Sequence, residues 1–395
     1  MYFNKNLFSR CNMMKRYEEF DSLRGLAALL VMIGHHMMLL PAYENYRYEL
    51  NSPFIVYLFK ETPLRLFFSS GNESVILFFV LSGFVLYLSI HNEKFHYDTY
   101  IIKRICRIYI PYVVAISIAI ITKMLFIRND MSYISDWFSK SWTTTDTLTL
   151  LLQHFVFIGE YNTDAYNNVI WSLVHEMRIS LVFPFLTFFF IRKRLRYSLL
   201  WFIVLSFSST IGLYFFDPSG SITSVFLSFH YITLFFMGAL LAKYRSLIFH
   251  YAFNMKKVVK IALLLIAIIC FMYEGMIGEV DFLNNYILRD YVVSFGVCIV
   301  MIMSVASWTF SALLRRKVFV FLGKISYSLY LYHLISLFSV MHLFYDKLPT
   351  ILIVFLSFSL SFLLSSFGYL FIEKPCINLG RHLTREGEEK YSRSL

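Results

Sequence analysis

Apolar residues are gathered along the chain in blocks of about twenty, and short polar links separate the blocks. An α-helix needs about 20 apolar residues to cross the hydrocarbon core of a bilayer, which is about 30 Å thick. The pattern predicts ten transmembrane helices, at approximately 22–41, 73–91, 104–127, 170–191, 198–216, 222–242, 258–274, 290–310, 325–344 and 351–372. The expected fold class is therefore an all-α polytopic membrane protein.

The basic residues assign the polar links to two sides. Of the 36 Lys and Arg residues, 27 fall near the two termini and near the links at 92–103, 192–197, 243–257 and 311–324. The other links lie near 42–72, 128–169, 217–221, 275–289 and 345–350. Because cytoplasmic links carry an excess of Lys and Arg, both termini are predicted to be cytoplasmic, in a multi-pass protein of the cell (inner) membrane.

Composition supports the membrane prediction and argues against other classes. The chain is 58% hydrophobic and 15% charged, whereas a soluble domain averages about 45–50% apolar and about 25% charged residues. The net charge of +11 comes from short basic stretches between apolar blocks, so the sequence does not indicate nucleic-acid binding. The five cysteines have no metal-ligand spacing, which predicts free thiols without a disulfide framework or a metal site.

No soluble domain is expected beside the membrane domain. The predicted organisation is a cytoplasmic leader at 1–20, one transmembrane domain at 21–373 and a cytoplasmic tail at 374–395. Met13 or Met14 is an alternative start, since "MKRYEEFDSLRG" makes a compact leader. Glu373-Lys374-Pro375 is interpreted as an interfacial stop after the last span.

Two ionisable residues lie eleven positions apart in the first span, within "DSLRGLAALLVMIGHH". At about 100° per residue, Arg24 and His35 share one helix face and are separated by about 16 Å along the axis. His36 points about 100° away from that face. Ionisable residues within a span are functional candidates, and a histidine suits general-base work on a hydroxyl. The alternative is a topology anchor at Arg24 and a packing residue at His35.

The fourth span opens with "NNVIWSLVHEMRISLVFP", which places Trp171, His175, Glu176 and Arg178 within its first turns. A buried carboxylate needs a partner, and Arg178, His175 and His35 are the three candidates for Glu176. A carboxylate that orients a basic histidine is common in nucleophilic catalysis. A local structural pair of Glu176 and Arg178 is the alternative.

A basic cluster of Lys103, Arg104 and Arg107 introduces the third span. Arg104 and Arg107 share a face at a spacing of three, and arginine matches the geometry of phosphate. Together with Arg24 they indicate a cytosol-facing anion pocket for a phosphorylated donor. A topology signal alone is the alternative.

Two further polar segments are interpreted as structural. Ser82 and Gly83, in "FFVLSGFVLY", are small residues that let helices approach closely. Ser326, Tyr330 and His333, in "LGKISYSLYLYHLIS", form a polar stripe that faces the bundle, and structure is favoured over chemistry there. The H-x4-D signature of glycerolipid acyltransferases, a P-loop and a G-x-S-x-G elbow do not occur.

The ordered set of motifs resembles the acyltransferase 3 family, membrane O-acyltransferases that modify bacterial surface glycans. The resemblance runs from Asp21 to Pro375 and rests on "FDSLRGLAALLVMIGHH", "FFVLSGFVLY", "RICRIYIPY", "WSLVHEMRISLVFP", "FFMGALLA", "LGKISYSLYLYH" and "FIEKP". Many members carry an SGNH-type domain after the membrane domain, and this chain ends too soon for one. After Glu176, "MRIS" stands where members often have an aromatic continuation, which leaves the role of that carboxylate open.

The resemblance implies an acyl-CoA, most simply acetyl-CoA, as donor substrate, with no bound cofactor. The acceptor it implies is a hydroxyl of a surface glycan or a lipid-linked saccharide at the outer side of the bilayer. Carried over by motif, His35 and Glu176 are the catalytic candidates and Arg24, Arg104 and Arg107 bind the donor. Supporting residues are Asp21, Trp171, Ser172 and Arg178.

Two alternatives to this function stay open from the sequence. Ten spans with buried charges also fit a transporter or flippase for a glycan precursor, which would need no acyl-CoA. An acyltransferase could also act on a lipid or small molecule, and the outer segments 42–72 and 128–169 are expected to select the acceptor.

Overall fold

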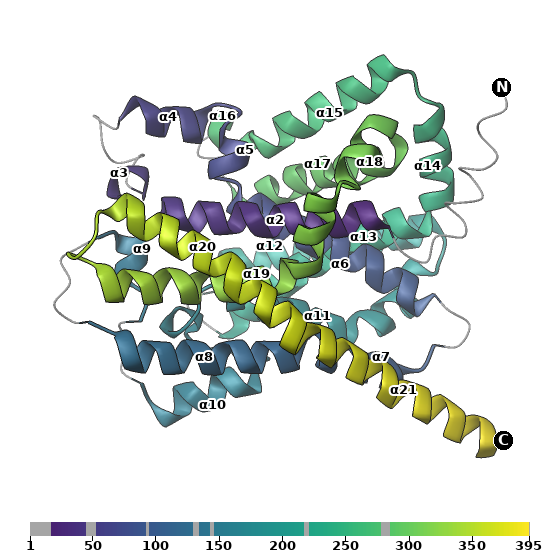
Figure 1. Ribbon diagram of the computed structural model, residues 1–395. Coiled ribbons are helices and arrows are strands. Elements are labelled where there is room, and N and C mark those ends of the chain that lie inside the picture. Colours follow the sequence, from purple (N-terminus) through teal and green to yellow (C-terminus); the bar gives the residue numbers. More distant parts are fainter. Residues whose placement is uncertain are drawn as a thin grey trace. The chain divides into compact units, whose positions relative to one another are not determined.

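The computed structural model describes residues 17–44, 53–91, 95–128, 134–142, 146–216, 221–277 and 285–394. Within these residues all regular structure is helical (Figure 1). Eight helical segments are long and apolar enough to cross a membrane: Gly71–Ile90, Tyr97–Phe126, Ile170–Ile191, Leu195–Phe215, Ile222–Lys243, Tyr286–Ala306, Lys317–Phe344 and Thr350–Thr384. The prediction of an all-α polytopic membrane protein is confirmed. Residues 1–16 of the expected leader lie outside the described part.

The other two expected spans are also helical but differ in character. The block at 22–41 falls in α2 (Glu18–Met37), whose first turn is acidic and whose last turn holds two histidines. These polar residues lower the hydropathy of the helix. The block at 258–274 falls in α15 (Lys257–Phe271), which has only 15 residues. The orientation of the termini stays a prediction.

The chain divides into two compact units, described separately below. Unit 1 comprises the described residues of Met1–Leu30, Leu58–His91 and Phe185–Lys324. Unit 2 comprises those of Val31–Tyr57, Asn92–Pro184 and Ile325–Leu395. Helices α2 and α19 (Lys317–Phe344) each contribute residues to both units.

The closest helix pair of unit 1 is α6 (Gly71–Ile90) with α13 (Ser221–Lys243). A Cβ at Gly83 would overlap the backbone of Phe235, and a Cβ at Gly238 would overlap that of Val80. Each helix therefore offers its glycine to the backbone of the other. The expected packing role of Gly83 is confirmed. The close approach of the two backbones increases the dispersion contact between the helices, which matters because the hydrophobic effect does not drive helix association within lipid.

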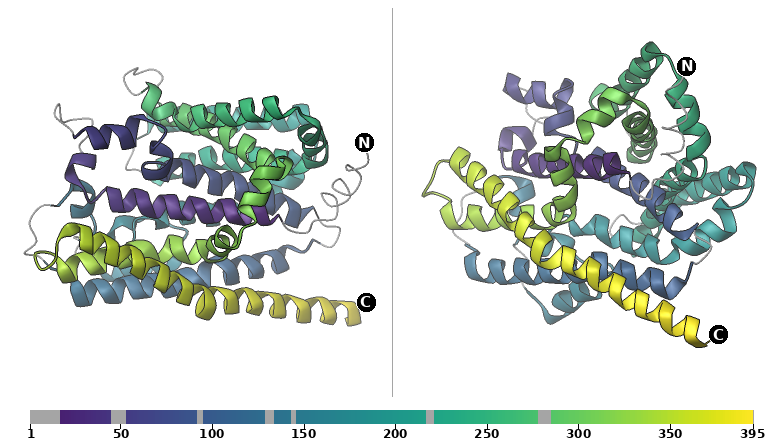
Figure 2. Two further views of the ribbon diagram at one scale, coloured as in Figure 1. Left: turned by 45° about the horizontal axis from the view of Figure 1, so that its top comes forward. Right: turned by 45° about the vertical axis from the view of Figure 1, so that its right-hand side comes forward.

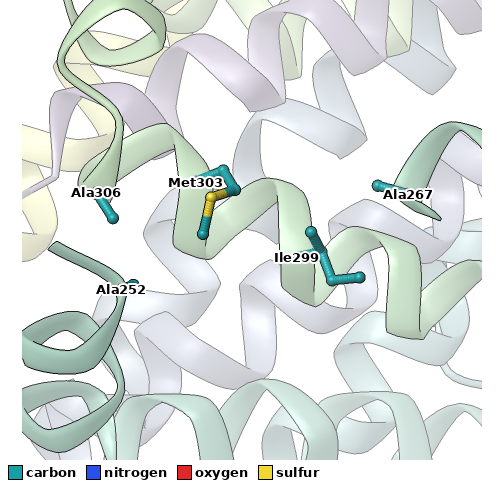
Figure 3. Packing of buried hydrophobic residues seen from close by; sticks show 5 residues of the cluster. All are labelled: Ala252, Ala267, Ile299, Met303 and Ala306. Carbon is teal, nitrogen blue, oxygen red and sulfur yellow. The ribbon is translucent and has the colours of Figure 1, made fainter. Parts of the chain in front are cut away.

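A second layer of unit 1 is built on α17 (Tyr286–Ala306), which packs along α15 and against α14 (Arg245–Asn254). Its apolar cluster consists of Ala252, Ala267, Ile299, Met303 and Ala306. Figure 3 shows Ile299 and Met303 projecting from α17 between the alanines of its two neighbours. Small residues on α14 and α15 leave the volume that these two larger side chains fill.

The first half of α2 is fixed within unit 1 by buried polar contacts. Ser22 Oγ donates to the carbonyl of Leu314 at 2.7 Å, and Arg315 Nε donates to Glu19 Oε1 at 2.8 Å. Gly25 faces the backbone of Gly323 so closely that a Cβ would not fit. Gly25 of "SLRG" and Gly323 of "FLGK" thus meet where α2 touches α19.

Unit 1 also contains a chain of buried ion pairs. Arg65, on α5 (Arg65–Phe68), is 5% exposed and donates from Nη2 to both Glu73 and Glu274. At the other end of this series of contacts, His230 Nε2 lies 3.0 Å from Asp290 Oδ2. Arg289 lies between Asp290 and Glu274 and links the two ends. Burial of the Arg65 and Glu73 charges is tolerable because they are paired with each other, although such pairs contribute little net stability.

Unit 2 contains a long helical segment formed by α20 (Thr350–Gly368), a π-helical turn at Tyr369–Glu373, and α21 (Lys374–Ser394). Figures 1 and 2 show it, in yellow, as one rod along α7 (Tyr97–Arg104). The helix continues through Glu373-Lys374-Pro375, and the interfacial end of the last span at this segment stays a prediction. The widened π turn just before Pro375 helps the helix to continue past the proline, because proline has no N–H to donate.

The α6–α13 contact makes a testable prediction about stability. We expect Gly83→Ala to lower the free energy of unfolding by about 1–3 kcal/mol, since the new methyl group meets backbone rather than a movable side chain. Gly71→Ala is the matched control on the same helix, because a Cβ there meets nothing within 4 Å. Thermal unfolding of both variants in detergent measures the difference. Equal unfolding temperatures would contradict the proposed close approach.

Candidate active site

The second half of α2 brings His35 against α19 within unit 2. His35 Nδ1 lies 2.9 Å from His333 Nε2, and the two rings are within 11° of parallel. His333 is fully buried, and its Nδ1 lies 2.9 Å from the carbonyl oxygen of Leu329. The predicted base is thus joined by a direct hydrogen bond to a second imidazole from the far end of the sequence.

An aromatic side chain from segment 128–169 covers the same histidine. Trp137, on the short helix α9 (Asp136–Ser139), is stacked on His35 with ring centroids 5.3 Å apart and an interplanar angle of 10°. Trp137 also contacts Phe338 of α19, with centroids 5.7 Å apart. The expected acceptor-selecting segment 128–169 therefore contributes a residue that touches His35.

His36 points elsewhere, as the helix geometry predicts. Its Nδ1 lies 2.8 Å from the carbonyl oxygen of Met32, and its Nε2 lies 3.0 Å from Ser357 Oγ of α20. These two contacts occupy both ring nitrogens. His36 is therefore a packing histidine that ties α2 to α20.

The motif at the start of α11 (Ile170–Leu186) meets α19 one turn from His333. Ser172 Oγ lies 2.7 Å from Tyr330 Oη, and Tyr330 Oη also donates to the carbonyl of Val169 at 3.2 Å. The rings of Tyr330 and His333 lie 6.2 Å apart. Ser172, expected as a supporting residue, is thus connected to the histidine pair through Tyr330. Trp171 contacts the His175 ring, with centroids 6.3 Å apart.

Glu176 is half-buried and lies close enough to the hydroxyls of Tyr327 and Tyr330 to interact with them electrostatically. The orienting contact at His35 Nδ1 is made by His333 instead of by this carboxylate. An orienting role for Glu176 at His35 stays a prediction. A catalytic role for Glu176 stays a prediction.

Arg178 bonds to the loop that precedes its helix. Its Nε donates to the carbonyl of Ile158 at 2.8 Å, and its Nη2 donates to that of Gly159 at 2.6 Å. These bonds fix the loop after α10 (Leu148–Val156) against α11. A supporting role for Arg178 at the site stays a prediction.

The expected donor-binding residues of the third span lie around a π-helical turn, Ile105–Tyr109. The Arg104 guanidinium lies over the Tyr100 ring at 5.7 Å, and Arg107 is exposed and interacts electrostatically with Tyr327. A shared face at a spacing of three requires an uninterrupted α-helix, whereas the π turn changes the angle between these two side chains. Arg24 and Asp21 belong to unit 1, so the expected grouping of Arg24 with Arg104 and Arg107 stays a prediction.

A partly buried ion pair anchors segment 128–169 to α8 (Ile110–Phe126). Lys123 Nζ lies 2.8 Å from Asp146 Oδ1, and Tyr166 Oη donates to the same oxygen at 2.7 Å. Partial burial acts to raise the pKa of Asp146, but its bonds with Lys123 and Tyr166 outweigh this and lower the pKa. Burial raises the pKa of Tyr166, and Asp146 adds to the shift.

Sequence reasoning missed His333 and Trp137 as parts of the site. His333 was placed in a polar stripe and interpreted as structural, although a histidine within a span is itself a functional signal. Trp137 carries no signal of its own in one sequence. Among the described residues, no group of three or more His, Cys, Asp or Glu side chains is arranged to hold a metal ion.

Comparison with known families gives one match to the chain. Residues 17–370 match the acyltransferase domain that defines the acyltransferase 3 family. The chain belongs to the acyltransferase 3 family. Comparison with curated proteins and with solved structures gives no match.

Family membership makes this chain a membrane acyltransferase and implies transferase activity. It is consistent with an acyl donor, an acceptor and the bilayer as partners. The match ends at residue 370.

The Lys123–Asp146 pair gives a prediction for the stability of this acyltransferase. We expect Asp146→Asn to cost about 3 kcal/mol, because it leaves the buried Lys123 ammonium without its carboxylate. The double variant Lys123→Met/Asp146→Asn should be more stable than Asp146→Asn alone. Thermal unfolding of the single and double variants measures this coupling.

The same pair predicts the direction of a pH effect. Because the pKa of Asp146 is lowered by folding, the pair stabilises the protein above the ordinary aspartate pKa of about 4. The contribution is lost as the pH falls through the folded-state pKa.

The measurement on the single and double variants can contradict the pairing of Lys123 and Asp146. It would do so if the losses of stability were additive in the double variant.

Proposed function

We propose that this acyltransferase 3 protein transfers an acyl group, most simply acetyl, from cytosolic acyl-CoA to a hydroxyl of a surface polysaccharide or its lipid-linked precursor. His35 acts as the base within the membrane domain. The observation that carries the proposal is the position of His35 between His333 and the outer-segment residue Trp137, in a chain whose residues 17–370 match an acyltransferase domain.

The proposed reaction is a direct transfer of the acyl group from the thioester to the acceptor hydroxyl. His35 takes the proton of the acceptor hydroxyl while the oxygen attacks the thioester carbonyl. The C–S bond breaks, the acyl group passes to the acceptor oxygen, and the proton passes to the sulfur of the departing CoA. A positioned general base contributes a typical factor of about 10²–10⁴ to such a step.

The donor side of the proposal rests on the sequence. Arg24 precedes His35 by eleven residues on α2, a rise of about 16 Å, and suits the phosphates of CoA at the predicted cytoplasmic face. Arg104 and Arg107 are the two further cations proposed for those phosphates. The pantetheine arm would then lead the thioester from these arginines toward His35.

The acceptor side is proposed for the outer segment. Trp137 lies beside the base, and the apolar face of a sugar ring stacks on aromatic side chains. The ion pair of Lys123 and Asp146 holds the following part of this segment on α8. Selection of the acceptor is therefore assigned to residues around α9.

The first test compares His35→Gln with its neighbour variant His36→Gln. Purified protein in liposomes receives labelled acetyl-CoA and a bacterial glycan extract, and label on the glycan is measured. We expect His35→Gln to lose at least about a hundredfold of the transfer rate, while His36→Gln, whose amide can still bond to Ser357, keeps it.

Unfolding temperatures of both variants show that the loss is not one of folding. Full activity of a folded His35→Gln protein would remove the base from the proposal. A folded parent that transfers no label from several acyl-CoAs would favour the transporter hypothesis.

A second test concerns Trp137. We expect Trp137→Ala to raise the KM for the glycan acceptor by up to about tenfold and to leave the KM for acyl-CoA unchanged, because a stacked aromatic contact contributes about 1 kcal/mol. Trp308→Ala is the matched control, since this tryptophan of unit 1 is 81% exposed. An increase confined to the KM for acyl-CoA would contradict the assignment.

A further inference from the structure

Three of the buried histidines of unit 2 share a local arrangement from which His35 departs. His36, His154 and His333 each place Nδ1 2.8–2.9 Å from the carbonyl oxygen four residues earlier, those of Met32, Leu150 and Leu329. His35 makes no such bond within its own helix. Its Nδ1 is bonded to the His333 ring instead.

The chain of contacts fixes where the protons lie. A carbonyl oxygen only accepts, so His333 Nδ1 carries the hydrogen that bonds to Leu329. In a neutral imidazole the other nitrogen is then an acceptor, and His333 Nε2 takes a hydrogen bond from His35 Nδ1. His35 is left with its hydrogen on Nδ1 and its lone pair on Nε2.

We propose that His333 is a positioning residue that holds His35 in the tautomer whose basic atom is Nε2. The inference rests on the proposed function, in which His35 is the base, and adds the residue that orients it. His333 does not touch the reacting atoms. It performs for His35 Nδ1 the role that a carboxylate performs in a catalytic triad.

The contacts around the two rings support this role. Trp137 lies parallel to His35 within 10°, which restricts rotation of the imidazole, and His333 is itself locked by Leu329 and fully buried. When His35 Nε2 takes the acceptor proton, Nδ1 keeps its hydrogen and continues to donate to the neutral His333. The pair therefore needs no rearrangement during the step, and the proton leaves again from Nε2 to the CoA sulfur.

The activity test uses two replacements of His333 and one control. His333→Leu removes the acceptor at Nε2, and we expect kcat to fall about tenfold to a hundredfold with little change in either KM. His333→Gln offers an amide oxygen to His35 Nδ1 and should recover a measurable part of kcat. His154→Leu is the control, because His154 is equally buried and has the same bond to its own helix.

The control separates positioning from packing. Both leucine variants should lower the unfolding temperature, whereas only His333→Leu should lower kcat. Equal loss of kcat in the glutamine and leucine variants of His333 would overturn the proposal, as would full activity in His333→Leu.

A second measurement reads the tautomer without any substrate. In protein labelled with ¹⁵N-histidine, long-range ¹H–¹⁵N correlation spectra distinguish a protonated from an unprotonated ring nitrogen, and His35→Gln identifies the His35 signals. We expect a protonated Nδ1 and an unprotonated Nε2 in the parent, and loss of this preference in His333→Leu. A parent His35 with its hydrogen on Nε2 would overturn the proposal even if transfer activity is found. Failure to transfer acyl groups, with the expected tautomer present, would instead count against the proposed function.

Discussion

Polar groups buried in this protein must find their hydrogen-bond partners within the chain, because lipid tails supply none. That constraint determines which helices of unit 2 meet. Ser172 of α11 meets Tyr330 of α19, and His36 of α2 meets Ser357 of α20. The same constraint joins His35 to His333, so the contact that satisfies a ring nitrogen is also the one that we propose orients His35.

Close backbone approach is the second organising feature, and it explains residues that carry no chemistry. Gly83 and Gly238 allow α6 and α13 to touch, while Gly25 and Gly323 do the same for α2 and α19 within unit 1. Both pairs lie inside motifs that the sequence resemblance used, "LSGF", "FMGA", "LRGL" and "LGKI". Part of that motif set therefore records helix packing rather than catalysis.

Hydropathy predicted the helices well, since burial in lipid demands apolar residues over a fixed length. It could not predict the partner of His35, because the contact joins residues 298 positions apart and only the folded chain brings them together. The π turn at Ile105–Tyr109 and the helix through Pro375 were also missed. Both depend on backbone hydrogen bonds that shift by one residue, which leaves no mark in the periodicity of side chains.

The rod formed by α20, the π turn and α21 runs from Thr350 to Ser394. At about 1.5 Å per residue its length is about 67 Å, more than twice the hydrocarbon thickness of a bilayer. No tilt within the usual range of about 0–40° can contain a helix of that length in the apolar core. Its later turns must project beyond the lipid as a stiff arm, so whatever contacts them is held at a fixed distance from the membrane surface.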